Sequence, residues 1–451
     1  NTSVGSLALN NNTTAANNTA VGYLALTTNT TASNNTAIGK SALQANTTGT
    51  ENTAVGSGSL DANTTGNNSV AFGRDSLTDN TTGSNNTGLG DNALANNTTA
   101  SNNTAVGKNA LVANTTGSEN VAVGTNALSA NTTAGNNVAI GKDALKANTI
   151  GNTNIAIGTD AMTTNVAADR NVAVGEQALQ NMTAASSTDT YNVGVGYNAG
   201  LAVTTGVRNA LIGGLAGTAL TTGGTNTALG YRAMGGATVT GNTNVAIGSD
   251  TLYVMTSGAN NTAVGYDAGG AVTSGANNTF LGKASGLSGS PGGAITTGSN
   301  EIVLGNADIT EAHIQVDWTV ASDARDKTDF TALDLGLDFV KALAPVTYKW
   351  DKRSKYGNKK ADDYDLNAQT PDGTHKEDWL DIGFKAQEVE ALEIAAGYNK
   401  DNKTNLVSSH TGDGKQMGLQ YSKFVPILVK AIQEQNALIE ALTTRITTLE
   451  G

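Results

Sequence analysis

Residues 322–327 read Ser-Asp-Ala-Arg-Asp-Lys and place a hydroxyl five positions before an amine. A serine hydroxyl becomes an effective nucleophile when a neighbouring base takes its proton, and a lysine can be that base when burial lowers its pKa toward neutrality. Ser322 and Lys327 are therefore candidates for acyl-transfer chemistry. Serine and lysine at this separation are common, however, and the segment taken alone is also a typical polar turn at the start of a domain.

The other chemically active residue types form no comparable set. The three histidines, His313, His375 and His410, are scattered without ligand spacing, and the chain has no cysteine. Structural and catalytic metal sites need clustered ligands of these types. We therefore expect no metal, no cofactor and no activity on external substrates.

Four segments of the C-terminal part occur in a fixed order. They are SDxRxK from Ser322, PVTYxW from Pro345, GFxAQEVE from Gly383 and YxKxVPxLVKAIQE from Tyr421. In these segments the chain closely resembles the intramolecular chaperone domain of phage tail fibres and tailspikes, the endosialidase-type self-cleaving peptidase family. The resemblance spans about residues 318–451, and four motifs in order make it specific.

The resemblance implies roles for the first motif. That family trimerises a β-helical shaft and then releases itself by cutting just before the serine of this motif. Carried over to this sequence, Ser322 is the nucleophile, Lys327 is its base, and the cut falls between Ala321 and Ser322. The implied enzyme is at most a single-turnover serine autopeptidase.

The remaining residues of the motif have supporting roles in this comparison. Asp323 and Arg325 would orient or stabilise the turn. Asp326 stands where the family more often has an apolar residue. A carboxylate that meets Lys327 would favour the charged amine and weaken the base.

Residues 1–305 form an internal repeat that precedes this motif. Glycine recurs every seventeen positions from Gly5 to Gly175, and the phase continues with insertions to Gly305, which makes eighteen repeats of the form NTAVGxxALxxNTTGxN. A fixed short period identifies a repeat architecture. Because glycine permits a corner and NTTG suits a second turn, each unit is predicted to be two short strands and two turns, one coil of a β-solenoid.

Each NTAVG strand has two faces. Residues three and one before the glycine, such as Thr53 and Val55, share one face, which we predict to be the apolar one. The alanine between them, as at Ala54, suits close approach of a neighbouring backbone, and a leucine four residues past the glycine, as at Leu60, completes a thin core. Because the core of each coil is thin, packing three chains together through their alanine or valine faces would bury more apolar surface.

Sequence and charge divide the chain into parts. The units NTAVG, NNVAIG and NIAIG resemble the NSVAIG units of trimeric adhesin head repeats, although the period of seventeen is longer than usual there. The shaft holds 23 charged residues and the remainder 41, so we place the boundary near residue 306. The predicted parts are a shaft at 1–305, a connector at 306–321, a chaperone and autopeptidase core at 322–420 and a helix at 421–451.

The C-terminal helix has a heptad pattern. Its apolar a and d positions, with one glutamine, are Val425, Leu428, Ile432, Gln435, Ile439, Leu442, Ile446 and Leu449. This pattern predicts a coiled coil. Isoleucine at a with leucine at d favours two strands in parallel coiled coils, so the expectation of three chains depends on the shaft and on the family resemblance.

The expected fold is mainly β, a solenoid shaft followed by an α+β domain that ends in the coiled-coil helix. The expected function is a structural fibre, a phage tail fibre or receptor-binding shaft in a virion. Identical repeats can misalign by whole coils at little cost, and a domain that forms a homotrimer first would set the register. The alternative is an extracellular or cell-surface trimeric adhesin or stalk that keeps the C-terminal domain as a permanent cap.

The expected partner is a host cell-surface receptor, a glycan or a surface protein. The repeat is interrupted in 176–240 and 283–304, where Tyr191, Tyr197 and Tyr231 are candidate contact residues, although plain loop and packing roles suit them as well. A net charge of −12 without a basic stripe argues against a nucleic acid partner. The sequence has no apolar run of the roughly 20 residues that a membrane span needs, so we expect no membrane insertion.

Two further interpretations of the repeats are weaker. Ladders of threonine could bind ice, but the threonines of each NTT are adjacent, as at Thr47 and Thr48, so one must point inward or sideways. The NTT triplets also match the pattern for N-glycosylation, and we attribute them instead to ladders of hydrogen bonds within the solenoid.

Overall fold

The computed structural model describes residues 1–184, 186–315, 320–357, 364–411 and 413–451. The chain forms two compact units, one of residues 1–283 and 296–302 and one of residues 284–295 and 303–451. Parts of the predicted connector 306–321 and of the predicted core 322–420 lie outside the described residues. The insertion 284–295 belongs to the second unit, where the Ala294 N–H donates to Asp413 Oδ2 over 3.1 Å.

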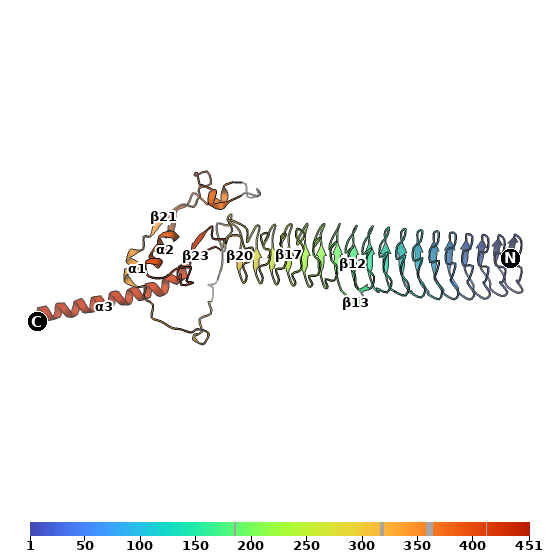
Figure 1. Cartoon of the computed structure of the whole chain (residues 1–451), viewed down its shortest axis with the longest axis horizontal. Coiled ribbons are helices and arrows are strands. Elements are labelled where there is room, and N and C mark those ends of the chain that lie inside the picture. Colours follow the sequence, from blue (N-terminus) through green and yellow to red (C-terminus); the bar gives the residue numbers. More distant parts are fainter. Residues whose placement is uncertain (185, 316–319, 358–363, 412) are drawn as a thin grey trace. The chain divides into compact units, whose positions relative to one another are not determined.

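The first unit is a stack of coils held by an 18-stranded sheet, whose last strand, β20, has only Ile302 in this unit (Figure 1). Its strands are β1 (Thr2–Val4), β2 (Thr19–Val21), β3 (Thr36–Ile38), β4 (Thr53–Val55), β5 (Val70–Phe72), β6 (Thr87–Leu89), β7 (Thr104–Val106), β8 (Val121–Val123), β9 (Val138–Ile140), β10 (Ile155–Ile157), β12 (Val172–Val174), β14 (Val193–Val195), β15 (Ala210–Ile212), β16 (Thr227–Leu229), β17 (Val245–Ile247), β18 (Thr262–Val264), β19 (Thr279–Leu281) and β20 (Ile302–Leu304). A small parallel pair, β11 (Ala168–Asp169) and β13 (Thr188–Asp189), lies outside this sheet.

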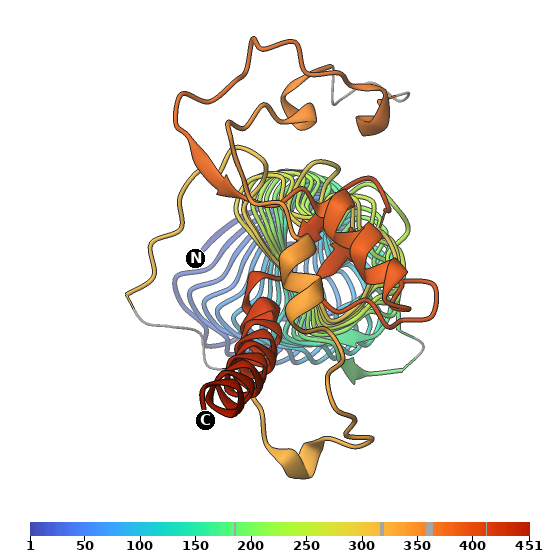
Figure 2. The same ribbon diagram turned by 90° about the vertical axis from the view of Figure 1, so that its left-hand side faces the viewer.

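Successive coils pair in parallel and in register. Ala37 lies opposite Ala54, and Thr36 lies opposite Thr53, so each residue meets its equivalent one repeat later. Viewed along the stack in Figure 2, the coils lie behind one another. The β-solenoid predicted from the seventeen-residue period of glycine is confirmed.

The prediction of two strands per coil is wrong. Apart from β11 and β13, each described coil contains one three-residue strand, and turns form the remainder. The residues two and four positions past the glycine have left-handed backbones, as at Asn109 with φ of 57° and Leu111 with φ of 52°. A strand requires negative φ, so these positions exclude a second strand.

The predicted orientation of the strands is also wrong. The central alanine, as at Ala54 and Ala71, is fully buried, whereas Val70 and Phe72 of the flanking positions are 42% and 53% exposed. The leucine four residues past the glycine is fully buried, as predicted. A coil of seventeen residues has room for alanine opposite leucine, so the larger β-branched and aromatic side chains of the strand point outward.

Two ladders of buried asparagine complete the interior. In the first, the Asn52 N–H donates to Asn35 Oδ1 over 2.9 Å and Asn52 Nδ2 donates to the Gly66 carbonyl over 2.8 Å. In the second, which is the Asn of the NTT triplets, Asn63 Nδ2 donates to Asn46 Oδ1 over 2.8 Å. These amides are fully buried, which confirms that the triplets serve ladder chemistry.

The first threonine of each NTT triplet points along the stack. The Thr47 hydroxyl donates to the Thr64 carbonyl of the next coil over 3.0 Å, and Thr64 does the same toward Thr81. The second threonine, as at Thr48, is exposed. The exposed threonines therefore form a single row on this turn, as the sequence argument against an ice-binding lattice required.

The interior changes character along the stack. The second asparagine ladder runs to Asn165, and the equivalent position in the next coil is the fully buried Met182. Apolar residues then hold the position at Val203, Leu220 and beyond. Two structurally distinct halves therefore share one period, and the change falls where the insertion with β13 begins.

The second unit contains short elements and one long helix. They are η1 (Ala324–Asp326), α1 (Leu337–Ala342), β21 (Val346–Tyr348), η2 (Arg353–Lys355), η3 (Leu366–Ala368), β22 (Asp381–Gly383), α2 (Ala386–Ala395), β23 (Ser408–His410), β24 (Met417–Leu419), η4 (Tyr421–Lys423) and α3 (Phe424–Glu450). Strands β21 and β22 pair antiparallel, as do β23 and β24.

The core of the second unit uses only one face of the start of α3. Phe424 and Ile427 pack with Phe339 of α1, Val389 of α2 and Val407. Beyond Ala431 every described residue of α3 is exposed or half-buried, and Figure 1 shows this helix extending past the other elements of its unit. Among the described residues, no helix has the length and apolar character needed to cross a membrane.

Candidate functional site

The structure brings Ser322 and Lys327 together. The short helical turn η1 lies between them, and it folds the chain back so that Lys327 Nζ lies 2.6 Å from Ser322 Oγ and 3.4 Å from the Ser322 carbonyl oxygen. This is the contact that a serine and its base require. Ala321, on the other side of the predicted cut, is exposed.

Asp323 and Arg325 hold the turn between these two residues. Asp323 Oδ1 accepts from the Arg325 N–H over 2.9 Å and so caps η1. The Arg325 guanidinium donates to the same carboxylate, with Nη2 2.6 Å from Oδ2. The hydrogen bonds from Arg325 lower the pKa of Asp323, and those to Asp323 raise the pKa of Arg325. This geometry suits the orienting role expected of the pair.

The Ser322–Lys327 contact lies in water. Residues 320–332 are exposed throughout. Burial would favour the neutral form of the Lys327 amine, and a single chain does not provide that burial. In the part of the chain that the structure describes, no ion pair joins Lys327 to Asp326, so the unfavourable contact considered from the sequence is absent. The two groups are in place, but the dry environment is not.

The other three motifs converge on one cluster. Val346 of the second motif lies opposite Gly383 of the third across β21 and β22. The Phe384 N–H donates to the Tyr421 hydroxyl over 3.2 Å, which joins the third motif to the fourth. Phe384 also packs on Phe424, with ring centroids 5.2 Å apart. Segments far apart in the sequence therefore build one structural centre.

A buried carboxylate missed in the sequence reasoning supports this centre. Glu393 of α2 is fully buried and accepts hydrogen bonds from the backbone N–H groups of Leu406, Val407 and Ser408 over 2.8, 2.5 and 3.0 Å. The Ser408 hydroxyl is a fourth donor to the same carboxylate. Glu393 thereby fixes the chain where it enters β23. The only sequence signal was an acidic residue at a helical position that faces the core.

The histidines have separate environments. His313 Nε2 lies 2.9 Å from Glu311 Oε2, and His410 Nε2 lies 2.6 Å from Glu390 Oε1. The ring of His375 packs edge-on against the ring of Tyr356. Over the described ranges, no group of three histidine, cysteine, aspartate or glutamate residues could hold a metal ion.

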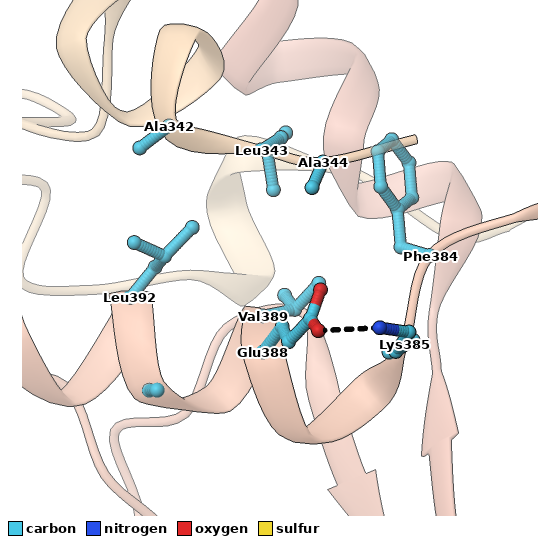
Figure 3. A pocket seen from close by; sticks show the side chains of 9 residues that line it. Ala342, Leu343, Ala344, Phe384, Lys385, Glu388, Val389 and Leu392 are labelled. Carbon is cyan, nitrogen blue, oxygen red and sulfur yellow. Dashed lines mark hydrogen bonds and ion pairs between the residues drawn. The ribbon is translucent and has the colours of Figure 1, made fainter. Parts of the chain in front are cut away.

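A pocket of about 290 Å³ lies between α2 and the end of α1 (Figure 3). Leu343, Phe384, Val389 and Leu392 make most of its lining apolar. Its two charged residues pair with each other, since Lys385 Nζ lies 2.7 Å from Glu388 Oε1. Because the lining is mostly apolar and its two charged side chains pair with each other, the pocket suits contact with an apolar surface better than it suits catalysis.

The three tyrosine candidates do not share one environment. Tyr197 and Tyr231 each follow the glycine that ends a coil's strand, and both are more than half exposed. Tyr266 has the same offset and is 46% exposed, so sequence reasoning missed an equivalent residue that the glycine phase could have identified. Tyr191 lies between β13 and β14 instead, where its hydroxyl donates to Asp189 Oδ2 over 2.9 Å and Arg170 lies over its ring.

Comparison with protein families bears on the second unit. A model of the Peptidase S74 family, described as chaperone of endosialidase, matches residues 322–398 and begins at Ser322. No curated protein matches the chain. The matched range includes the turn with Ser322 and Lys327, the β21–β22 pair and α2. Residues 322–398 of this β-solenoid protein are therefore similar to the chaperone domain of the endosialidase type.

Proposed function

We propose that the chain is the shaft of a trimeric fibre whose C-terminal unit assembles three copies, sets their register and then cuts itself off before Ser322. The observation that carries the proposal is the apolar heptad row of α3. Ile432, Ile439 and Ile446 of this row are 57%, 52% and 53% exposed. The core of their own unit uses the other face, Phe424, Ile427 and Ala431, so the row is free for other copies.

The outward face of the shaft strands supports the same assembly. Ile38, Phe72, Leu89 and Ile140 lie in one row of the sheet and are 38% to 53% exposed. Large apolar rows on the surface of a protein mark interaction sites. Another shaft with the same spacing between coils could contact this apolar row along its whole length. Other copies of this chain have that spacing.

Register explains why a separate assembly domain is useful. Shifting one shaft by a whole coil places Ala54 where Ala37 was and changes little except at the ends. The shaft by itself therefore specifies the register between identical copies only weakly. Joining three copies first at the C-terminal helix would fix the register before the shaft closes.

The exposed dyad gives cleavage its place in this sequence of events. Attack of Ser322 Oγ on the Ala321 carbonyl would move the acyl group from nitrogen to oxygen, with Lys327 taking the hydroxyl proton and returning a proton to the amide nitrogen. Water would then hydrolyse the ester and leave a new carboxylate at Ala321. Because the amine is exposed in one chain, burial by a neighbouring copy would activate it, so cleavage would follow assembly.

The proposed location is a virion tail fibre that contacts a host surface. The support is the endosialidase-type chaperone domain and the shaft, and the described residues include no membrane-spanning helix. An adhesin or stalk that keeps the domain would have the same fold. The two differ in whether the chain is cut.

The copy number tests the assembly role. We expect light scattering to give the mass of three chains for the Ser322→Ala variant, and of one chain when Ile439→Asp is added, since three aspartates would then face one another in the heptad row. Thr444→Asp, on the outer side of the same helix, is the matched control and should remain trimeric. A monomeric Ser322→Ala variant, or a trimeric variant carrying Ile439→Asp, would contradict the assembly role.

Intact mass tests the cleavage. We expect wild-type protein to yield a fragment that ends at Ala321, and Ser322→Ala to remain full length. Lys327→Arg keeps a cation at the turn but removes the amine that would act as the base, because a guanidinium stays protonated, so it should also remain full length. Thr328→Ala, which changes a neighbouring hydroxyl, should be cut normally. Uncut wild-type trimers would favour the permanent cap of an adhesin or stalk.

A further inference from the structure

Three tyrosines form a regular row on the surface of the shaft. Tyr197, Tyr231 and Tyr266 each come directly after the glycine that follows β14, β16 and β18. They are 54%, 53% and 46% exposed. These three residues are called the tyrosine row below.

The spacing of the row is set by the sheet. Strands β14 to β18 pair in register, so equivalent residues are one strand spacing apart along the stack. With about 4.8 Å per strand, the tyrosines repeat at about 9.6 Å. The coils between them carry the small residues Gly214 and Ser249 at the same offset, which leaves room beside each ring. A Cβ at Gly214 would lie 3.8 Å from Tyr231 Cδ2, so this ring leans over the smaller coil.

Each tyrosine is followed by a planar polar side chain. The three are Asn198, Arg232 and Asp267. Asn198 Oδ1 is buried and has no hydrogen-bond partner among the described residues, so it can accept from a ligand once the amide turns outward. The Arg232 guanidinium stacks on Tyr253 at 4.2 Å and lies 3.3 Å from Asp250, which fixes its position beside the row.

We propose that the tyrosine row binds an extended β-1,4-linked glycan that lies along the shaft. An aromatic face suits the apolar face of a sugar ring, and planar amide, guanidinium and carboxylate groups suit pairs of hydroxyls. The disaccharide of an extended β-1,4-linked chain repeats at about the distance between alternate coils. A further copy of this chain is the one protein surface described here with a related period, and the copy-number measurement below separates it from a glycan; among other ligands the regular row favours a polymer with that repeat.

This inference deepens the host-surface contact of the proposed function, and it rests on that function for the biological setting. Binding itself depends only on the shaft. The full chain with Ser322→Ala, which is expected to stay uncut, allows binding and copy number to be measured on one sample.

Calorimetric titration with cellohexaose, chitohexaose and maltohexaose tests the proposal. We expect at least one of the first two, which are extended, to bind at least tenfold more tightly than maltohexaose, whose α-1,4 links curve the chain. Tyr231→Ala should weaken that binding about tenfold, the value of one aromatic contact, and Tyr231→Phe should keep it. Tyr23→Ala is the matched control, because Tyr23 has the same offset and 50% exposure but lies outside the tyrosine row, has no tyrosine at this offset in the neighbouring coils and precedes Leu24.

Three binding results would overturn the proposal. They are no binding of either extended hexasaccharide, equal binding of maltohexaose, and equal loss from Tyr23→Ala and Tyr231→Ala. Loss of trimers in Tyr231→Ala would also overturn it, since the row would then be a contact between copies. A chain that forms trimers without binding glycan would refute this inference and leave the assembly function standing, whereas a glycan-binding monomer would do the reverse.

Discussion

Replacing Asn97 by alanine tests whether buried amides hold the shaft together. Asn97 belongs to the second asparagine ladder and is fully buried. Its Nδ2 donates to Asn80 Oδ1 over 2.8 Å and to the Ala100 carbonyl over 3.0 Å, and its Oδ1 accepts from Asn114 Nδ2 over 2.9 Å. The substitution removes all three hydrogen bonds and leaves their partners buried.

The cost follows from what those partners keep. The Ala100 carbonyl retains Asn86 Nδ2 at 2.8 Å, and Asn114 Nδ2 retains the Gly117 carbonyl at 2.9 Å. Asn80 Oδ1 retains no hydrogen-bond donor among the described residues. One buried acceptor without a partner and two weakened groups together cost roughly 2–4 kcal/mol per chain.

Hydrogen exchange of the full chain measures this effect locally. Coils of a solenoid contact only their neighbours, so we expect faster exchange in peptides between residues 77 and 120 and unchanged exchange in coils before residue 40. The matched control is Thr99→Ala, which removes an exposed hydroxyl from the same turn and should change exchange little. Equal exchange in the two variants would refute the view that the ladder amides stabilise the stack.

Two predictions concern the second unit. Glu393→Gln replaces an acceptor oxygen by an amide group opposite the donors of Leu406, Val407 and Ser408, and we expect it to destabilise the unit by roughly 1–3 kcal/mol in urea denaturation, with Glu388→Gln on the exposed side of α2 near wild type; equal effects would contradict the role of Glu393. The hydrogen bond from the Leu337 N–H lowers the pKa of Glu434 from its ordinary value of 4.5. A lowered folded-state pKa contributes stability above the unfolded value that is lost as pH falls through the folded value. The urea midpoint should therefore drop as pH falls below about 4.5, and Glu434→Gln should reduce that dependence; an identical pH profile in the variant would show that this carboxylate is not involved.

Much of the architecture is determined by the sequence alone. The spacing from Gly5 to Gly175 specifies coils of seventeen residues, because identical units stack only by pairing with their own copies. The leucine row and the heptads of α3 are likewise periodic, so their positions follow from counting. The motif from Ser322 to Lys327 is short enough for a local turn to bring its ends together, which the structure shows at 2.6 Å.

Only the tertiary structure decided which residues face inward and which distant residues meet. Ala54 rather than Val55 points into the coil, because the turns opposite the strand set the width of the interior. Those turns contain residues with positive φ, such as Leu111 in a later coil. Alternation along a strand specifies two faces but cannot say which one is inside when both are weakly apolar. The capture of three backbone N–H groups by Glu393 joins residues thirteen to fifteen positions apart across a loop, and no period announces such a contact.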